Sequence, residues 1–250
     1  MDRIIYTAMS GAQQTLDTQA VVSHNLANAT TTGFRAQLSA MRAVPVQGDA
    51  LLPTRTSVVA STPRADFSVG NITTTDRALD VAIQAGGWLA VQDNEGQEAY
   101  SRRGDLQVDS NGLLLSGGRP VLGDGGPIIV PLESQLSIGA DGTISAIGVG
   151  ETPDALVQVD RLKLVQPDES QLLRGADGLF RPDPASGPMV LPQDENIQLV
   201  SGALESSNVS AIESMVAMID NARRYDMQMK VISSADENAQ RANSLLSLQG

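Results

Sequence analysis

Residues 209–247 decide the fold, and they read VSAIESMVAMIDNARRYDMQMKVISSADENAQRANSLLS. One stripe recurs along them at alternating steps of three and four: Met215, Met218, Ala222, Tyr225, Met229, Ile232, Asp236, Ala239, Asn243 and Leu246. Eight of these ten residues are apolar or aromatic, and the mean step of about 3.5 residues is the period of a coiled-coil seam. Ser210 and Glu213 have the spacing of a capping box. The stretch therefore predicts one helix of roughly 58 Å, at about 1.5 Å per residue.

A second, weaker helical pattern occupies residues 1–35. Its stripe consists of Ile5, Met9, Ala12, Leu16, Ser23 and Leu26. Asp2 suits the start of this helix and Gly33 its end. Because a long helix with an uncovered seam is unstable alone in water, the two terminal helices are expected to pair with each other as a coiled coil. The alternative is that both helices dock on the rest of the chain as a lid.

The middle of the chain has the composition of a β domain. All 12 prolines lie between Pro45 and Pro192, and short apolar runs flank the turn sequences 86–87, 109–112, 141–142 and 177–178, each of which predicts a hairpin. The fold class is therefore α+β, with an all-β domain inserted between two long helices. We expect an amino-terminal helix at 1–35, an extended connector at 36–71, a β-rich domain at 72–200 and a coiled-coil helix at 201–250.

Composition excludes several kinds of chemistry. The chain of 250 residues has no Cys and a single His, His24, so thiolate catalysis, Cys-ligated metal sites and multi-histidine sites are ruled out. A net charge of −12 disfavours nucleic acid and anionic lipid as partners. No apolar run approaches the roughly 20 residues that cross a bilayer, and the first residues lack the pattern of a cleaved signal peptide. We therefore expect no cofactor and no stable membrane insertion.

Two kinds of site remain to be weighed on the acidic middle. The runs starting at Asp93 and Asp109 resemble calcium loops, but the twelfth positions are Gly104 and Pro120 instead of Glu, so turn chemistry explains them better. Paired carboxylates for sugar hydrolysis are numerically available. The region 72–200 nevertheless offers only Trp88, Tyr100 and Phe180 as aromatic platforms, and no catalytic residue is assigned.

Three separated motifs carry a family resemblance. Residues 25–35, NLANATTTGFR, and residues 201–209, SGALESSNV, resemble the two signatures of the bacterial flagellar axial proteins, the rod and hook subunits. Between them, the third motif consists of two short runs, LDVAI at 79–83 and YSRRG at 100–104, which match the same family. The motif residues assigned to this chain are Asn25, Leu26, Asn28, Gly33, Phe34, Leu204, Glu205, Asn208 and Val209. Departures are Trp88-Leu89, where relatives usually carry two aromatics, and His24, where many carry Asn.

The resemblance implies a structural role without enzymatic activity. It is strongest to the proximal-rod subunits that adjoin the distal rod, with a distal-rod subunit as the alternative. Family membership implies terminal helices that pack between subunits of a helical tube, with related proximal- and distal-rod subunits as partners. It also implies export by the flagellar export apparatus without a cleaved signal peptide, and a place in the basal body within the cell envelope. A cell-wall hydrolase and a ligand-binding module are the rival classes.

Overall fold

In a computed structural model of the chain, the described residues are 2–45, 56–61, 65–84, 86–148, 150, 156–185, 188 and 190–247. For 2–4, 40–45, 56–61 and 245–247 the description covers the backbone alone. The chain divides into two compact units. We call residues 1–29, 37–66 and 209–250 the helical unit, and residues 30–36 and 67–208 the β unit.

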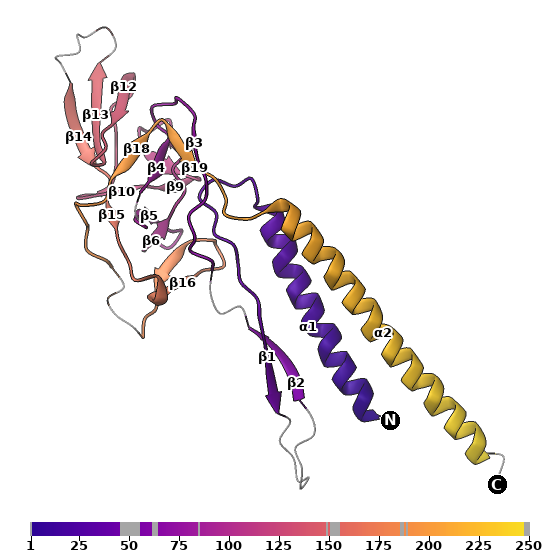
Figure 1. The fold of residues 1–250 in the computed structure, drawn as a ribbon. Helices are drawn as coiled ribbons and strands as arrows, with labels where there is room; N and C mark the ends of the chain where they lie inside the picture. The colour runs from indigo at the N-terminus through magenta and orange to yellow at the C-terminus, as the bar shows by residue number, and fades with distance from the viewer. Residues whose placement is uncertain are drawn as a thin grey trace. The chain divides into compact units, whose positions relative to one another are not determined.

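The helical unit contains the two long helices, α1 (Asp2–Ala27) and α2 (Ala211–Ser247), which lie side by side and run antiparallel (Figure 1). Strands β1 (Ala40–Pro45) and β2 (Thr56–Ser61) of the same unit pair antiparallel. None of the helices in the described residues has both the length and the apolar character needed to cross a membrane.

The ends of the helices follow local chemistry. The Ser210 side chain accepts a hydrogen bond from the Glu213 N–H at 3.3 Å, as expected from the capping pattern, and α2 begins one residue later. Helix α1 ends at Ala27, so the helix expected to reach residue 35 is shorter than the sequence pattern indicated. The β-branched run 30–32 disfavours helical continuation, and Gly33, expected to stop the helix, lies in the β unit instead.

The β unit is built from short antiparallel strands. The largest sheet among the described residues has the order β15 (Leu164–Val165), β5 (Trp88–Gln92), β6 (Glu98–Ser101), β17 (Phe180–Pro182) and β16 (Leu172–Arg174). Two three-stranded sheets are β7 (Leu106–Val108), β8 (Leu114–Ser116) and β9 (Arg119–Pro120), and β12 (Ser134–Ile138), β13 (Thr143–Gly148) and β14 (Val157–Arg161). Three pairs complete the unit: β10 (Leu122–Gly123) with β11 (Gly126–Pro127), β4 (Val81–Ile83) with β18 (Leu199–Ser201), and β3 (Ile72–Thr74) with β19 (Ala203–Glu205). A 3₁₀ turn spans Glu169–Gln171.

Three of the four predicted hairpins are confirmed. Turns at 109–112, 141–142 and 177–178 join β7 to β8, β12 to β13 and β16 to β17. The hairpin predicted around 86–87 is wrong, because β4 pairs with β18 and β5 pairs with β6 and β15. Strand β18 thus occupies the position beside β4 that the turn at 86–87 suggested for β5.

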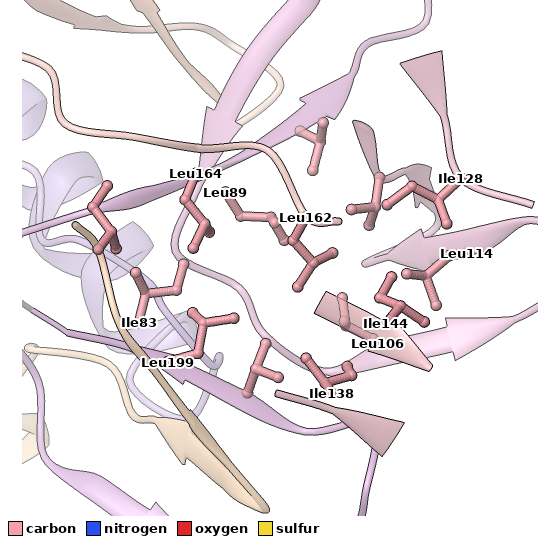
Figure 2. Close-up of a cluster of buried hydrophobic side chains, with 14 of the residues drawn as sticks. Ile83, Leu89, Leu106, Leu114, Ile128, Ile138, Ile144, Leu162, Leu164 and Leu199 are labelled. Atoms are coloured by element: carbon pink, nitrogen blue, oxygen red, sulfur yellow. The ribbon is translucent and has the colours of Figure 1, made fainter. Parts of the chain in front are cut away.

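Aliphatic side chains from most of these strands meet in one core (Figure 2). Ile83, Leu89, Leu114, Ile144 and Leu162 are all essentially inaccessible to solvent. Beside this core, Trp88 packs against Phe67 and Phe180 at centroid distances of 6.0 and 4.7 Å. The aromatic residues considered as sugar platforms therefore include two, Trp88 and Phe180, that serve as packing.

Candidate functional site

Helices α1 and α2 meet where their side chains are small or polar. Thr15 Oγ1 donates a hydrogen bond to Gln228 Oε1 at 3.1 Å, and both Ala12 and Thr15 are buried. Gly11 lies at the same level, and a Cβ there would stand 2.9 Å from the Gln228 amide nitrogen. Small residues at 11 and 12 therefore allow the two helices to approach closely.

The less exposed side chains of α2 also alternate in steps of four and three. They are Ala211, Ser214, Met218, Asn221, Tyr225, Gln228, Ile232, Ala235, Ala239 and Ala242, and Ala217 is half-buried beside them. This stripe shares every second member with the predicted seam, namely Met218, Tyr225, Ile232 and Ala239. The other predicted members Met215, Ala222, Met229, Asp236 and Asn243 are exposed, and the residue immediately before each of them is the less exposed one. The side chain of Leu246 lies outside the described residues.

The predicted seam of α1 is divided in the same way. Ile5 and Leu26 are half-buried, whereas Met9 and Leu16 are exposed. The residues covered best are Ala12, which belongs to the predicted stripe, and Thr15, which does not. The structure thus brings together part of each predicted stripe and leaves the rest at the surface of the single chain.

Sequence reasoning named only one residue, Met215, of an apolar face at the amino-terminal half of α2. It consists of Ile212, Met215, Val216 and Ile219, with exposed fractions of 77%, 54%, 55% and 55%. We call these four residues the outer face of α2. Their spacing of i, i+3, i+4 and i+7 is that of one side of an amphipathic helix, and it could have been found as a second stripe beside the predicted one.

The motif at the end of α1 is held by two hydrogen bonds between the side-chain amide of Asn25 and the backbone of Gln37. Asn25 Oδ1 accepts from the Gln37 N–H at 2.8 Å, and Asn25 Nδ2 donates to the Gln37 carbonyl at 2.9 Å. Asn28 Nδ2 donates to the His24 carbonyl at 2.9 Å, close to the end of the helix. Asn25 and Asn28 therefore hold the turn within the helical unit.

Gly33 and Phe34 belong to the β unit and are held there by close contacts. Gly33 has a φ of +65°, and a Cβ at this position would lie 2.4 Å from the carbonyl carbon of Arg102. Only glycine fits so tight an approach in that conformation. Phe34 is buried, and the Arg174 guanidinium lies 4.6 Å from the centroid of its ring, within cation–π range.

A buried ionic cluster joins the three motifs. Glu205 Oε1 lies 2.5 Å from Arg35 Nη1, and Glu205 Oε2 lies 2.6 Å from Arg102 Nη2. The three side chains are only 1–2% exposed. Burial is the main cause that lowers the pKa of Arg102, and the Glu205 carboxylate opposes it. We call Arg35, Arg102 and Glu205 the ionic cluster; sequence reasoning named Glu205 as a motif residue but assigned no role to either arginine.

Asn208 completes the contacts around the cluster. Its Oδ1 accepts from the Ala36 N–H at 2.8 Å, its own N–H donates to the Phe34 carbonyl at 3.3 Å, and its Nδ2 donates to the Ser68 carbonyl at 3.1 Å. Leu204 pairs with Thr73 in the β3–β19 ladder and is half-buried. Val209, the last residue of this motif, is half-buried in the helical unit.

The acidic turns do not gather into an ion site. Asp109 Oδ1 accepts from the N–H groups of Asn111 and Leu113 at 2.8 and 2.9 Å, and Asp93 Oδ1 accepts from Glu95 and Gln97 in the same way. Within the described residues, no group of three or more His, Asp or Glu side chains could hold a metal ion. The carboxylates in these turns thus serve the backbone.

Family models of known proteins match three segments of the chain. Residues 5–35 match a family model of flagella basal body rod proteins, and residues 82–146 match a model of the D1 domain of the flagellar hook protein FlgE/F/G. Residues 200–245 match a model of the C-terminal region of the flagellar basal body rod FlgEFG proteins. Each of these three segments contributes one member of the ionic cluster.

Full-length relatives narrow the class. The chain is 54% identical to the flagellar basal-body rod protein FlgF of Escherichia coli K12, with 99% of this chain and 100% of the relative covered. Identity and coverage are the same for FlgF of Salmonella typhimurium LT2. The flagellar basal-body rod protein FlgG of Buchnera aphidicola from Schizaphis graminum is 31% identical over 90% of this chain and 92% of the relative.

The chain therefore belongs to the family of flagellar basal-body rod proteins. These relatives are structural proteins of the basal body and not enzymes, so the cell-wall hydrolase alternative finds no support. Identity is higher to the FlgF relatives than to the FlgG relative, which favours the first of the two subunit types weighed from the sequence.

Proposed function

We propose that this chain is a proximal-rod building block whose terminal helices pack against those of neighbouring, related rod subunits. The observation that supports this most is the outer face of α2, Ile212, Met215, Val216 and Ile219, which is exposed in the single chain. Four large apolar side chains on one side of a helix gain free energy when another surface removes them from water, at about 25 cal/mol per Å². A contact between unlike surfaces that does not close on itself extends into a helical tube.

Within the subunit, we propose that α1 and α2 pair as a coiled coil and that both helices use a second set of side chains between subunits. The residues assigned to these seams are Ile5, Met9, Leu16, Leu26, Met215, Met218, Ala222, Tyr225, Met229, Ile232 and Leu246. Met218, Tyr225 and Ile232 are half-buried and belong both to the stripe of less exposed residues on α2 and to the predicted seam. They are suited to take part in both contacts.

We assign a separate role to each successive segment of the chain. Residues 1–35 and 201–250 supply the helices and the two terminal motifs, 36–71 is the connector, and 72–200 is the β domain, of whose compact unit 30–36 and 201–208 are also part. The partners are proximal- and distal-rod subunits of the same family, and the related FlgF and FlgG proteins are consistent with such an assembly. Export by the flagellar apparatus and torque transmission along the rod complete the proposal.

The test changes the outer face without disturbing the single chain. Ile219→Asp places a charge on an exposed position of α2, and Ser234→Asp places the same charge on an exposed polar position of the same helix. Both purified variants should keep the wild-type circular dichroism and melting temperature. In cells that express only the variant, Ile219→Asp should abolish rod completion and swimming, whereas Ser234→Asp should retain both. Normal rods and swimming with Ile219→Asp would refute the role of this face.

A further inference from the structure

Two segments that are far apart in the sequence hold each other in the β unit. Segment 33–36 follows α1 along the chain and segment 205–208 precedes α2. The Gly33 N–H donates to the Glu205 carbonyl at 2.8 Å, and the Asn208 N–H donates to the Phe34 carbonyl at 3.3 Å. Backbone contacts therefore run in both directions between them.

Two side-chain contacts reinforce this pairing. Arg35 Nη1 pairs with Glu205 Oε1 at 2.5 Å, and Asn208 Oδ1 accepts from the Ala36 N–H at 2.8 Å. The Arg35 and Glu205 side chains are 2% and 1% exposed, so water cannot replace the lost partner if either side chain is removed.

The ionic cluster contains one cation more than its anion requires. Arg102 alone provides four hydrogen bonds, two to Glu205 Oε2 and one each to the carbonyls of Gly87 and Ile83. Glu205 is therefore paired and bonded without Arg35. Arg35 Nε has no hydrogen-bond partner among the described residues, and the charge of Arg35 is one of the causes that lower the pKa of Arg102.

The charge of Glu205 is thus already balanced by Arg102, and the need for a counter-charge does not explain why Arg35 is buried there as well. Buried ionic groups that add little to stability have been found in other proteins to select one arrangement over its alternatives. Here the alternatives are shifted positions of segment 33–36. A slip by one residue would set Phe34 or Ala36 against Glu205 and would move the guanidinium of Arg35 away from its carboxylate, leaving a buried charge unpaired.

We propose that Arg35 and Asn208 are positioning residues of a clamp that fixes segment 33–36 to segment 205–208 in a single register. Arg102 and Glu205 form the fixed part of this clamp. Arg35 selects the register, because its ion pair with Glu205 forms only when the two segments are correctly aligned. The clamp sets where the chain enters the β unit after α1 and where it leaves the unit before α2. These are two of the four points where the chain passes between the two units. In the proposed rod, part of the force between the helices and the β unit would pass through them, and this last consequence alone rests on the proposed function.

The test is hydrogen exchange of the full-length monomer, followed at single amides. Arg35→Met keeps the length of the side chain and removes its charge, and Asn208→Ala removes the side-chain hydrogen bonds to the Ala36 N–H and the Ser68 carbonyl. The control Lys163→Met breaks another ion pair of the β unit, Lys163 to Glu98 at 2.7 Å, whose two residues are not part of the clamp. The amides of Gly33 and Ala36 report on the clamp, and those of Leu114 and Val121, hydrogen-bonded in the core, report on the β unit as a whole.

Both clamp variants should speed exchange at Gly33 and Ala36 by about tenfold or more, with Leu114 and Val121 unchanged within about threefold. Lys163→Met should leave Gly33 and Ala36 at the wild-type rate. Wild-type exchange at Gly33 and Ala36 in both clamp variants would overturn the proposal. An equal increase at all four amides in both variants would also overturn it, because it would mean general destabilisation. Neither measurement depends on rod assembly, so the result stands apart from the test of Ile219.

Discussion

Replacing Glu205 by Gln should unfold the β unit far more readily than its small change in shape suggests. The substitution removes the only anion of the ionic cluster and leaves two arginines, 1–2% exposed, without a counter-charge. One of the two carboxylate oxygens becomes an amide nitrogen, which cannot accept the bonds that Gly70, Arg35 or Arg102 now donate. Removing one member of a buried ion pair costs about 3–5 kcal/mol.

This cost is large against the roughly 5–15 kcal/mol that stabilises a typical domain. For a unit of this size about 4 kcal/mol corresponds to a fall of roughly 8–16 °C in the melting temperature. The assay needs no added label, because Trp88 is the only tryptophan of the chain and lies buried in the β unit. Its fluorescence during urea and thermal unfolding reports the stability of this unit alone.

The matched control is Glu98→Gln, the same chemical change at an ion pair with Lys163 whose side chains are 11% and 16% exposed. Because this pair is nearer to solvent, its loss should cost about 1 kcal/mol. A Glu205→Gln variant that unfolds within about 1 kcal/mol of Glu98→Gln would refute the reasoning, since the buried charges would then be tolerated without their anion.

Three further predictions concern other contacts. Gly33→Ala should destabilise the β unit by at least about 1 kcal/mol in urea unfolding, because a Cβ at 2.4 Å from the Arg102 carbonyl carbon forces the turn apart; an unchanged midpoint would contradict this. Arg181 holds the pKa of Asp177 and of Asp93 below their usual range, so the stability they contribute is present above about pH 4 and is lost as the pH falls through their lowered values. Melting temperatures from pH 7 to pH 2 should therefore fall less steeply in Arg181→Met than in the wild type, and parallel curves would count against the assignment. Ala12→Leu should separate α1 from α2 and lower the melting temperature of the helical unit, followed by far-ultraviolet circular dichroism, because Ala12 is buried beside the contact of Thr15 with Gln228; a melting temperature equal to that of the wild type would show that the helices do not approach closely there.

Local chemistry made part of the fold predictable. The turn 109–112 forms because the Asp109 carboxylate binds N–H groups two and four residues ahead, and that interaction is complete within five residues. The start of α2 depends in the same way on Ser210 and Glu213. Such features can be derived from a short window of sequence, since all the atoms involved are neighbours along the chain.

Strand partners chosen across the whole chain were not predictable by the same reasoning. The Gly-Gly turn at 86–87 suggested that β4 and β5 form a hairpin, yet β4 pairs with β18, more than a hundred residues later. A turn sequence limits only how the chain bends. Which strand fills the neighbouring position depends on the core that the two edges share, and Ile83 meets Leu199 there.

The stripe of less exposed residues on α2 coincides with the predicted seam at every second position and is shifted by one residue at the others. Large apolar residues were assumed to face α1, whereas the contact with α1 uses Gln228 beside Gly11 and Thr15. A single sequence shows that a helix has an apolar stripe but does not show which of two adjacent stripes faces its own partner helix. Where small residues allow close approach, polar positions such as Asn221 can be buried while Met215 and Met229 stay exposed.

The ionic cluster explains why the three motifs occur together in one chain. Arg35 is separated from Arg102 by 67 positions and from Glu205 by 170, so no periodic pattern connects them. The side chains of both arginines nevertheless bind the one carboxylate of Glu205. Two of the motifs also contain a glycine against which another segment packs closely. A Cβ on Gly33 would meet Arg102, and a Cβ on Gly104 would meet the Val81 carbonyl oxygen at 1.7 Å. Residues 33–35 of the first motif are therefore part of the β unit's interior, and the β unit includes segments from both sides of the chain's middle, 30–36 and 67–208.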